Sequence, residues 1–333
     1  MIGKQSLNEN LIARLRRRRA IVLAKIYLCL IPGLIFLLIF SYYPFFSAFF
    51  YSLYKWDGAN LSYIGFQNFI NIASDERLIP SIVNISILTG TSIIYLLTFP
   101  LMAAVFIHNL KNFKWQNIYR FLFTIPLVIP WVVTILVWAF LYDPIDGPIN
   151  RFLISLGLQH YTRAWLADFD ITIWALTMIG GAGSGTGVGF PFVSGMNLLI
   201  YLAGLNNISK EVKESAFIAG ASGWQMFRFI ELPLKKTQIR INIFFTIISQ
   251  LQAFQTVILL TRGGPGYSTM VPGMAMYQDA FDFSRMGYAS AIGVVLFLIM
   301  LIFTLFINQR LKSETEFDPN KLKNELFQKR KDN

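Results

Sequence analysis

The chain has 333 residues, of which 55% are hydrophobic and 14% are charged, against about 45–50% and about 25% in soluble globular domains. This balance excludes an ordinary soluble domain and predicts an all-α integral membrane protein. The net charge of +11 would suit nucleic acid only if the basic residues formed one surface, so their positions must be examined first.

Near the N-terminus, a basic stretch with five arginines from Arg14 to Arg19 precedes an apolar run over residues 26–54. A signal peptide has an apolar segment of about 7–15 residues. The run is therefore too long for a signal peptide and is predicted to remain as a first membrane span. We expect residues 1–25 to form a basic tail.

Five further apolar runs are also long enough to cross a hydrocarbon core, which takes roughly 20 helical residues. The six predicted spans cover residues 26–54, 81–107, 119–142, 170–204, 237–260 and 287–309. They define a transmembrane domain over 26–309, with a core over 81–309, a loop over 205–236 and a charged C-terminal tail over 310–333. An even number of spans places both termini on one side.

The basic residues indicate which side that is. Of the 29 Lys and Arg residues, 23 lie in the tails and loops on the side of the termini and six lie on the other side. Because cytoplasmic loops carry the excess of Lys and Arg, both termini are predicted to be cytoplasmic. The basic excess thus reports topology, and nucleic acid is excluded as a partner.

The sequence contains no visible energy source of its own. Charged residues lie only near the ends of the six spans, whereas an ion-coupled secondary transporter needs an ionisable group near the midplane. No GxxxxGK[ST] phosphate loop is present, and His108 and His160 lie in separate loops. We therefore expect neither an enzyme nor a metal site.

The loop over 205–236 is predicted to fold into two short helices. Ser209 can cap a first helix with Glu211 in its first turn, and Gly220 is expected to end it. Ser222 and Gln225 match a capping box for a second helix, which Pro233 is expected to stop.

The same loop carries a family motif, EAA-xxx-G-x9-I-x-L-P. Glu214, Ser215 and Ala216 are followed after three residues by Gly220, after nine more by Ile230, and then by Leu232 and Pro233. Ser215 in place of alanine is the one departure. The chain therefore resembles membrane permease subunits of binding-protein-dependent ATP-binding-cassette importers.

This resemblance implies a type I importer permease fold in the cytoplasmic membrane. It implies that Glu211 to Phe229 form a coupling helix that enters a cleft of a cytoplasmic ATPase, with Glu214 pairing with a basic group. It also implies a second permease subunit, two ATPase subunits that bind ATP and Mg²⁺, and an external binding protein. No cofactor is expected in this chain.

Other stretches indicate the substrate class. TRGGPGYST from Thr261 and YQDAFDFSRMGYASAIG from Tyr277 look like segments of sugar permeases, so the chain is identified as a carbohydrate-uptake permease. Related sequences carry glycerol phosphodiesters or other solutes. A non-transporting scaffold or sensor that binds an ATPase is a further alternative.

Two polar or glycine-rich features inside the spans allow two interpretations each. The stretch over 180–189 contains glycines four residues apart, which favours close helix packing but could also break the helix. The amides of Asn197, Gln250, Gln252 and Gln255 suit an uncharged sugar along a translocation path. Buried amides also form bonds between helices.

Overall fold

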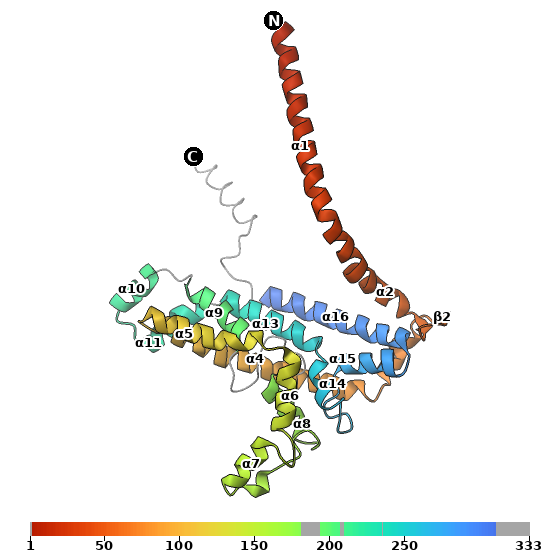
Figure 1. Ribbon diagram of the computed structural model, residues 1–333, viewed down its shortest axis with the longest axis vertical. Coiled ribbons are helices and arrows are strands. Elements are labelled where there is room, and N and C mark those ends of the chain that lie inside the picture. The colour runs from red at the N-terminus through yellow and green to blue at the C-terminus, as the bar shows by residue number, and fades with distance from the viewer. Residues whose placement is uncertain (1, 181–193, 207–209, 235, 311–333) are drawn as a thin grey trace.

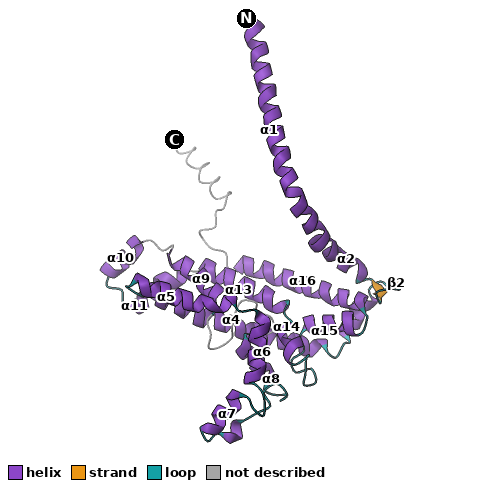
Figure 2. Cartoon of the chain, in the orientation of Figure 1, coloured by secondary structure: helices purple, strands orange, loops and turns teal. Residues whose placement is uncertain are grey.

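A computed structural model describes residues 2–180, 194–206, 210–234 and 236–310. Nearly all of its regular structure is helical, with one β-hairpin (Figure 2). The α-helices are α1 (Ile2–Leu37), α2 (Tyr43–Tyr51), α3 (Gln67–Ala73), α4 (Leu78–Asn109), α5 (Phe113–Thr124), α6 (Trp131–Leu141), α7 (Pro148–Ser155), α8 (Thr172–Ile179), α9 (Gly195–Asn206), α10 (Lys210–Ile218), α11 (Gly223–Met226), α12 (Leu232–Leu234), α13 (Lys236–Leu251), α14 (Gln255–Leu260), α15 (Pro272–Tyr277) and α16 (Met286–Arg310). Three π-helical turns occupy Leu38–Tyr42, Phe227–Glu231 and Gln278–Asp282, and two 3-10 turns occupy Ile125–Val128 and Gln159–Tyr161.

Three helical segments of the described chain are long and apolar enough to cross a membrane. They are Ile21–Tyr51, Leu78–Asn109 and Met286–Ile307, and they correspond to the first, second and sixth predicted spans. The protein is therefore membrane-embedded, as its composition predicts.

The predicted span over 119–142 is not one continuous helix. Phe113–Val128 and Trp131–Leu141 are apolar enough to count as one span together, but they are bent by 89° at the break between them. Pro126 and Pro130 lie at this break. Each proline removes a backbone donor and clashes with a helical carbonyl, so an α-helix cannot continue straight through both.

The fifth predicted span, 237–260, is also interrupted. Helix α13 ends at Leu251 and α14 begins at Gln255, so residues 252–254 lie outside both helices. Of the fourth predicted span, 170–204, the structure describes α8 and α9 at its two ends. The glycine-rich stretch over 181–189 lies outside the described residues, and its two interpretations stay predictions.

The body of the protein packs around α4, which contacts α8, α9, α13 and α15. Figure 1 shows α4, α13 and α16 running along this body, while α1 projects away from it. The first core cluster includes Leu88 of α4, Leu176 of α8 and Ile292 of α16. The second includes Ala104 of α4 and Leu198 of α9, so α4 joins both.

The β-hairpin connects α2 to the body. Strands β1 (Tyr54–Trp56) and β2 (Leu61–Tyr63) pair antiparallel, with Tyr54 opposite Tyr63. The hairpin packs against α16 at Gly287, where a Cβ atom would collide with the backbone oxygen of Tyr54. Glycine is needed at this point because two backbones meet there.

We expect Gly287→Ala to destabilise the protein by about 1–3 kcal/mol, since inserting a methyl group into a closely packed contact forces the backbone to move. Gly90→Ala is the matched control, because Gly90 lies inside α4 with open space around its Cα. Thermal unfolding of the purified protein measures both. Equal melting temperatures for the two variants would contradict the close contact at Gly287.

Candidate functional site

We call the loop over residues 205–236, which carries the family motif, the motif loop. Its first helix, α10, projects at one end of the helical body (Figure 1). It begins at Lys210 with Glu211 in its first turn, and the predicted cap Ser209 lies outside the described residues. Glu214 and Ser215 are exposed, and Ala216 is half-buried. The Ser215 hydroxyl donates to the backbone oxygen of Glu211 at 2.7 Å, so Ser215 is held within its own helix.

Gly220 ends this helix, as predicted. Its φ is +78°, a left-handed conformation that glycine adopts without steric cost. The backbone N–H of Ala221 then donates to the oxygen of Ala216 at 3.0 Å, the long bond of a Schellman motif. Glycine therefore sets the sharp reversal between α10 and α11.

The second helix begins as predicted but does not stop as predicted. Ser222 and Gln225 form a complete capping box ahead of α11. The prediction that Pro233 ends this helix is wrong, since α12 contains Pro233 and reaches Leu234. A π-helical turn at Phe227–Glu231 precedes it, with the N–H of Leu232 donating to the oxygen of Phe227. The wider π register accommodates a proline whose ring would clash in a regular α-helix.

The loop has one face toward the body and another toward solvent. Phe227 and Leu232 pack against the second core cluster between α4 and α9, while Ile230 is half-buried. Ile218, Trp224 and Phe229 are 85%, 68% and 71% exposed. These three exposed apolar side chains belong to the loop that carries the motif, where contact with another protein would bury them.

The four predicted amides occupy two different environments. Asn197 and Gln250 are buried, at 8% and 1% exposure, whereas Gln252 and Gln255 are exposed beside the break between α13 and α14. The Gln250 amide donates to the Ser92 hydroxyl and to the backbone oxygen of Gly180, both at 2.9 Å. Gln250 thus connects α4, α8 and α13.

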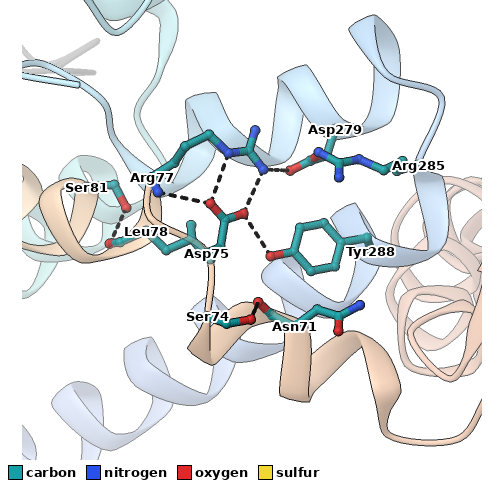
Figure 3. A network of polar contacts seen from close by, with 9 residues as sticks. All are labelled: Asn71, Ser74, Asp75, Arg77, Leu78, Ser81, Asp279, Arg285 and Tyr288. Carbon is teal, nitrogen blue, oxygen red and sulfur yellow. Dashed lines mark hydrogen bonds and ion pairs between the residues drawn. The ribbon is translucent and has the colours of Figure 1, made fainter. Parts of the chain in front are cut away.

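A charged network lies at the end of the body opposite α10, and sequence reasoning missed it (Figure 3). Arg77, just ahead of α4, binds both oxygens of Asp75 at 3.0 and 2.7 Å and one oxygen of Asp279 at 2.9 Å. Asp279 also pairs with Arg285. The Tyr288 hydroxyl donates to Asp75 at 2.9 Å.

This network joins segments that are far apart in the chain. Asp279 is completely buried, which requires the two arginines because an unpaired buried carboxylate is very costly. Burial alone raises the pKa of Asp75, but the hydrogen bonds from Arg77 and Tyr288 outweigh it and hold that pKa below its usual value. The signal available in the sequence was the position of Asp279 and Arg285 directly before the last span.

A pocket of about 940 Å³ opens beside the network. Residues of the β-hairpin, of α3 and of the turn before α16 line it, among them Trp56, Asn71 and Arg285. Only the tertiary structure brings these segments together.

We expect Asp279→Asn to lower the free energy of unfolding by about 3 kcal/mol, because it leaves two arginines without their buried carboxylate. The double variant Arg77→Met with Asp279→Leu should cost less than the sum of its two single variants, since both members of the pair are then removed together. Thermal unfolding of the wild type, Arg77→Met, Asp279→Leu and the double variant measures this coupling, and Asp279→Asn is measured beside them. Strict additivity would contradict the ion pair between Arg77 and Asp279.

Comparison with known proteins agrees with these features. Residues 96–313 match the family described as "Binding-protein-dependent transport system inner membrane component". A probable ABC transporter permease protein of Pyrococcus horikoshii is 32% identical over 293 residues, covering 86% of this chain and 96% of that protein. A diacetylchitobiose uptake system permease protein of Streptomyces coelicolor is 28% identical, covering 83% of this chain and 79% of that protein.

A solved structure has the same fold. The crystal structure of a bacterial alginate ABC transporter, in complex with an alginate pentasaccharide-bound periplasmic protein, contains a chain that matches with a TM-score of 0.73 at 24% identity. The match covers 87% of this chain and 95% of that chain. With the motif loop, the membrane helices and these matches in agreement, the chain belongs to the family of inner membrane components of binding-protein-dependent transport systems.

Proposed function

We propose that this chain is a permease subunit of an ATP-binding-cassette importer that moves a sugar or oligosaccharide across the cytoplasmic membrane. The observation that carries this proposal is the motif loop, which exposes Glu214 and several apolar side chains and which packs on the helical body through Phe227 and Leu232. A permease subunit is not an enzyme. ATP and Mg²⁺ would be bound by partner subunits.

The sugar substrate class is supported by relatives. The Streptomyces relative is named for diacetylchitobiose uptake, and the fold match belongs to an alginate transporter. A glycerol phosphodiester is the alternative substrate, and it carries a negative charge that a neutral oligosaccharide lacks. Uptake of labelled neutral oligosaccharides in competition with glycerol phosphodiesters distinguishes the two classes.

The proposed topology is the one predicted from the sequence. Six spans cross the membrane with both termini in the cytoplasm, in a type I permease fold, and residues 26–309 form the transmembrane domain between the tails 1–25 and 310–333. The bent pair α5–α6 and the interrupted pair α13–α14 would each form one span. Broken helices of this kind are tolerated where they line a cavity or are buried in protein.

The second permease subunit is supported by the exposed face of α1 and α2. In the span Ile21–Tyr51, the most apolar window is not buried at all by this chain. A second, similar subunit beside these helices would bury part of that surface. Two ATPase subunits on the cytoplasmic side and an external sugar-binding protein complete the proposed assembly.

The motif residues have proposed roles that follow their placement. Glu211, Glu214, Ser215, Ala216 and Gly220 would form the knob that docks into the ATPase. Ile230, Leu232 and Pro233 would connect the knob to α13. Movement of the ATPase would reach the membrane helices through Phe227 and Leu232, because these side chains contact the second core cluster.

The amides keep their proposed place along the sugar path. Gln252 and Gln255 are exposed at the interruption between α13 and α14, and interrupted helices commonly form transporter binding sites. Asn197 and Gln250 are buried, so they would act by holding the surrounding helices in place. The hydrogen bonds of Gln250 to α4 and to the end of α8 support this division.

We expect Glu214→Ala combined with Gly220→Pro to abolish uptake while membrane insertion stays intact. Proline cannot adopt the positive φ of residue 220, so the turn between α10 and α11 is lost. The assay is ATP-driven uptake by the chain reconstituted with its partner subunits. Glu76→Ala, which removes an exposed glutamate at the opposite end of the body, is the matched control.

Unchanged uptake in the double variant would rule out the coupling role of the loop. Binding of the ATPase without any uptake by the wild-type complex would favour a non-transporting scaffold. Uptake by this chain alone in response to an ion gradient would favour a secondary transporter.

A further inference from the structure

Three polar side chains between α9 and α13 have buried polar atoms without hydrogen-bond partners in the described part of the chain. These atoms are the Tyr201 hydroxyl, the Gln238 carbonyl oxygen, and both the amide nitrogen and the oxygen of Asn242. Tyr201 and Asn242 are 0% exposed. Because this chain alone buries Tyr201 and Asn242 completely, neither lipid nor a partner subunit can reach these two side chains.

The three side chains lie at one contact between the two helices. Gln238 packs against Gly204 so closely that a Cβ on residue 204 would lie 2.6 Å from the Gln238 side-chain carbonyl carbon. One turn further along each helix, Asn242 lies beside the Tyr201 hydroxyl, without the geometry of a normal hydrogen bond. The surroundings are apolar and include Leu198.

The position of this contact connects it with the motif loop. Helix α9 leads into α10, and α13 follows α12, so the contact lies between the helices that enter and leave the loop. Phe227 and Leu232 of the loop pack against the core cluster that contains Tyr201. A displacement of the loop would therefore act on both sides of this contact.

Such an arrangement is unfavourable by itself. A buried polar group without a partner loses its hydration and gains nothing in return, whereas an apolar group of similar shape would have no such cost. Unpaired buried groups in a native protein therefore need an explanation. Packed helices have discrete alternative arrangements, and a second arrangement can supply the missing partners.

We propose that Tyr201, Gln238 and Asn242 are positioning residues for transport, and that they hydrogen-bond across α9 and α13 in a second conformation, which ATP binding in the partner subunits favours. The absence of a Cβ at Gly204 lets Gln238 shift along α9 between the two arrangements. The contact thus biases the equilibrium between the two conformations. This inference rests on the proposed function and assigns three residues to its coupling step.

The test uses Asn242→Leu and Tyr201→Phe in the complete complex with its second permease subunit and ATPase subunits. Both variants remove polar atoms and keep approximate shape. Without nucleotide, their melting temperatures should equal or exceed that of the wild type, because unpaired groups are gone. With ATP and vanadate, the stabilisation should be smaller than in the wild type, and uptake should fall by about 5- to 30-fold, the factor that 1–2 kcal/mol corresponds to.

Ser249→Ala is the control, since the Ser249 hydroxyl donates to the Thr246 oxygen within α13, and it should behave as the wild type. Equal destabilisation of the two variants with and without nucleotide would show a purely structural role and overturn the proposal. Wild-type uptake in both variants would also overturn it. A wild-type complex without ATP-driven uptake would instead contradict the proposed function, and this inference with it.

Discussion

The packing of α4 is the interaction on which the rest of the structure depends. Its first half contributes Leu78, Ile85 and Leu88 to one core cluster, and its second half contributes Leu101 and Ala104 to the other. In a membrane the surrounding lipid is as apolar as these side chains, so helices associate through close packing and polar contacts. Because α4 packs along its whole length, it fixes the positions of the two core clusters relative to each other.

The two ends of α4 meet different chemistry. At its N-terminus Arg77 and the buried carboxylate of Asp279 connect α3 and α4 to the segment before α16. At the other end, the neighbouring helices α9 and α13 meet through Gln238 and Gly204 and continue into the motif loop. The charged end is held by ion pairs between Arg77, Asp75, Asp279 and Arg285. The end near the loop is held by apolar packing and contains the unpaired polar atoms of Tyr201, Gln238 and Asn242.

Local signals in the sequence predicted local structure well. Gly220 and the capping box of Ser222 with Gln225 depend on the backbone of a few neighbouring residues, and the structure confirms both. Pro233 was misjudged because a preceding π-helical turn, which has no clear sequence signal, accommodates its ring. The bend at Pro126 and Pro130 was missed because hydropathy counts apolar length and ignores direction.

The sequence by itself determined that this protein is helical and membrane-embedded, and that it carries the permease motif, because composition and spacing act over short stretches of chain. Tertiary structure decided which polar side chains meet. Asp75 and Asp279 are separated by about two hundred residues but share Arg77, and Tyr201 lies beside Asn242 only because α9 packs on α13. Such contacts depend on how helices are placed in three dimensions, and no periodicity within one helix encodes that placement.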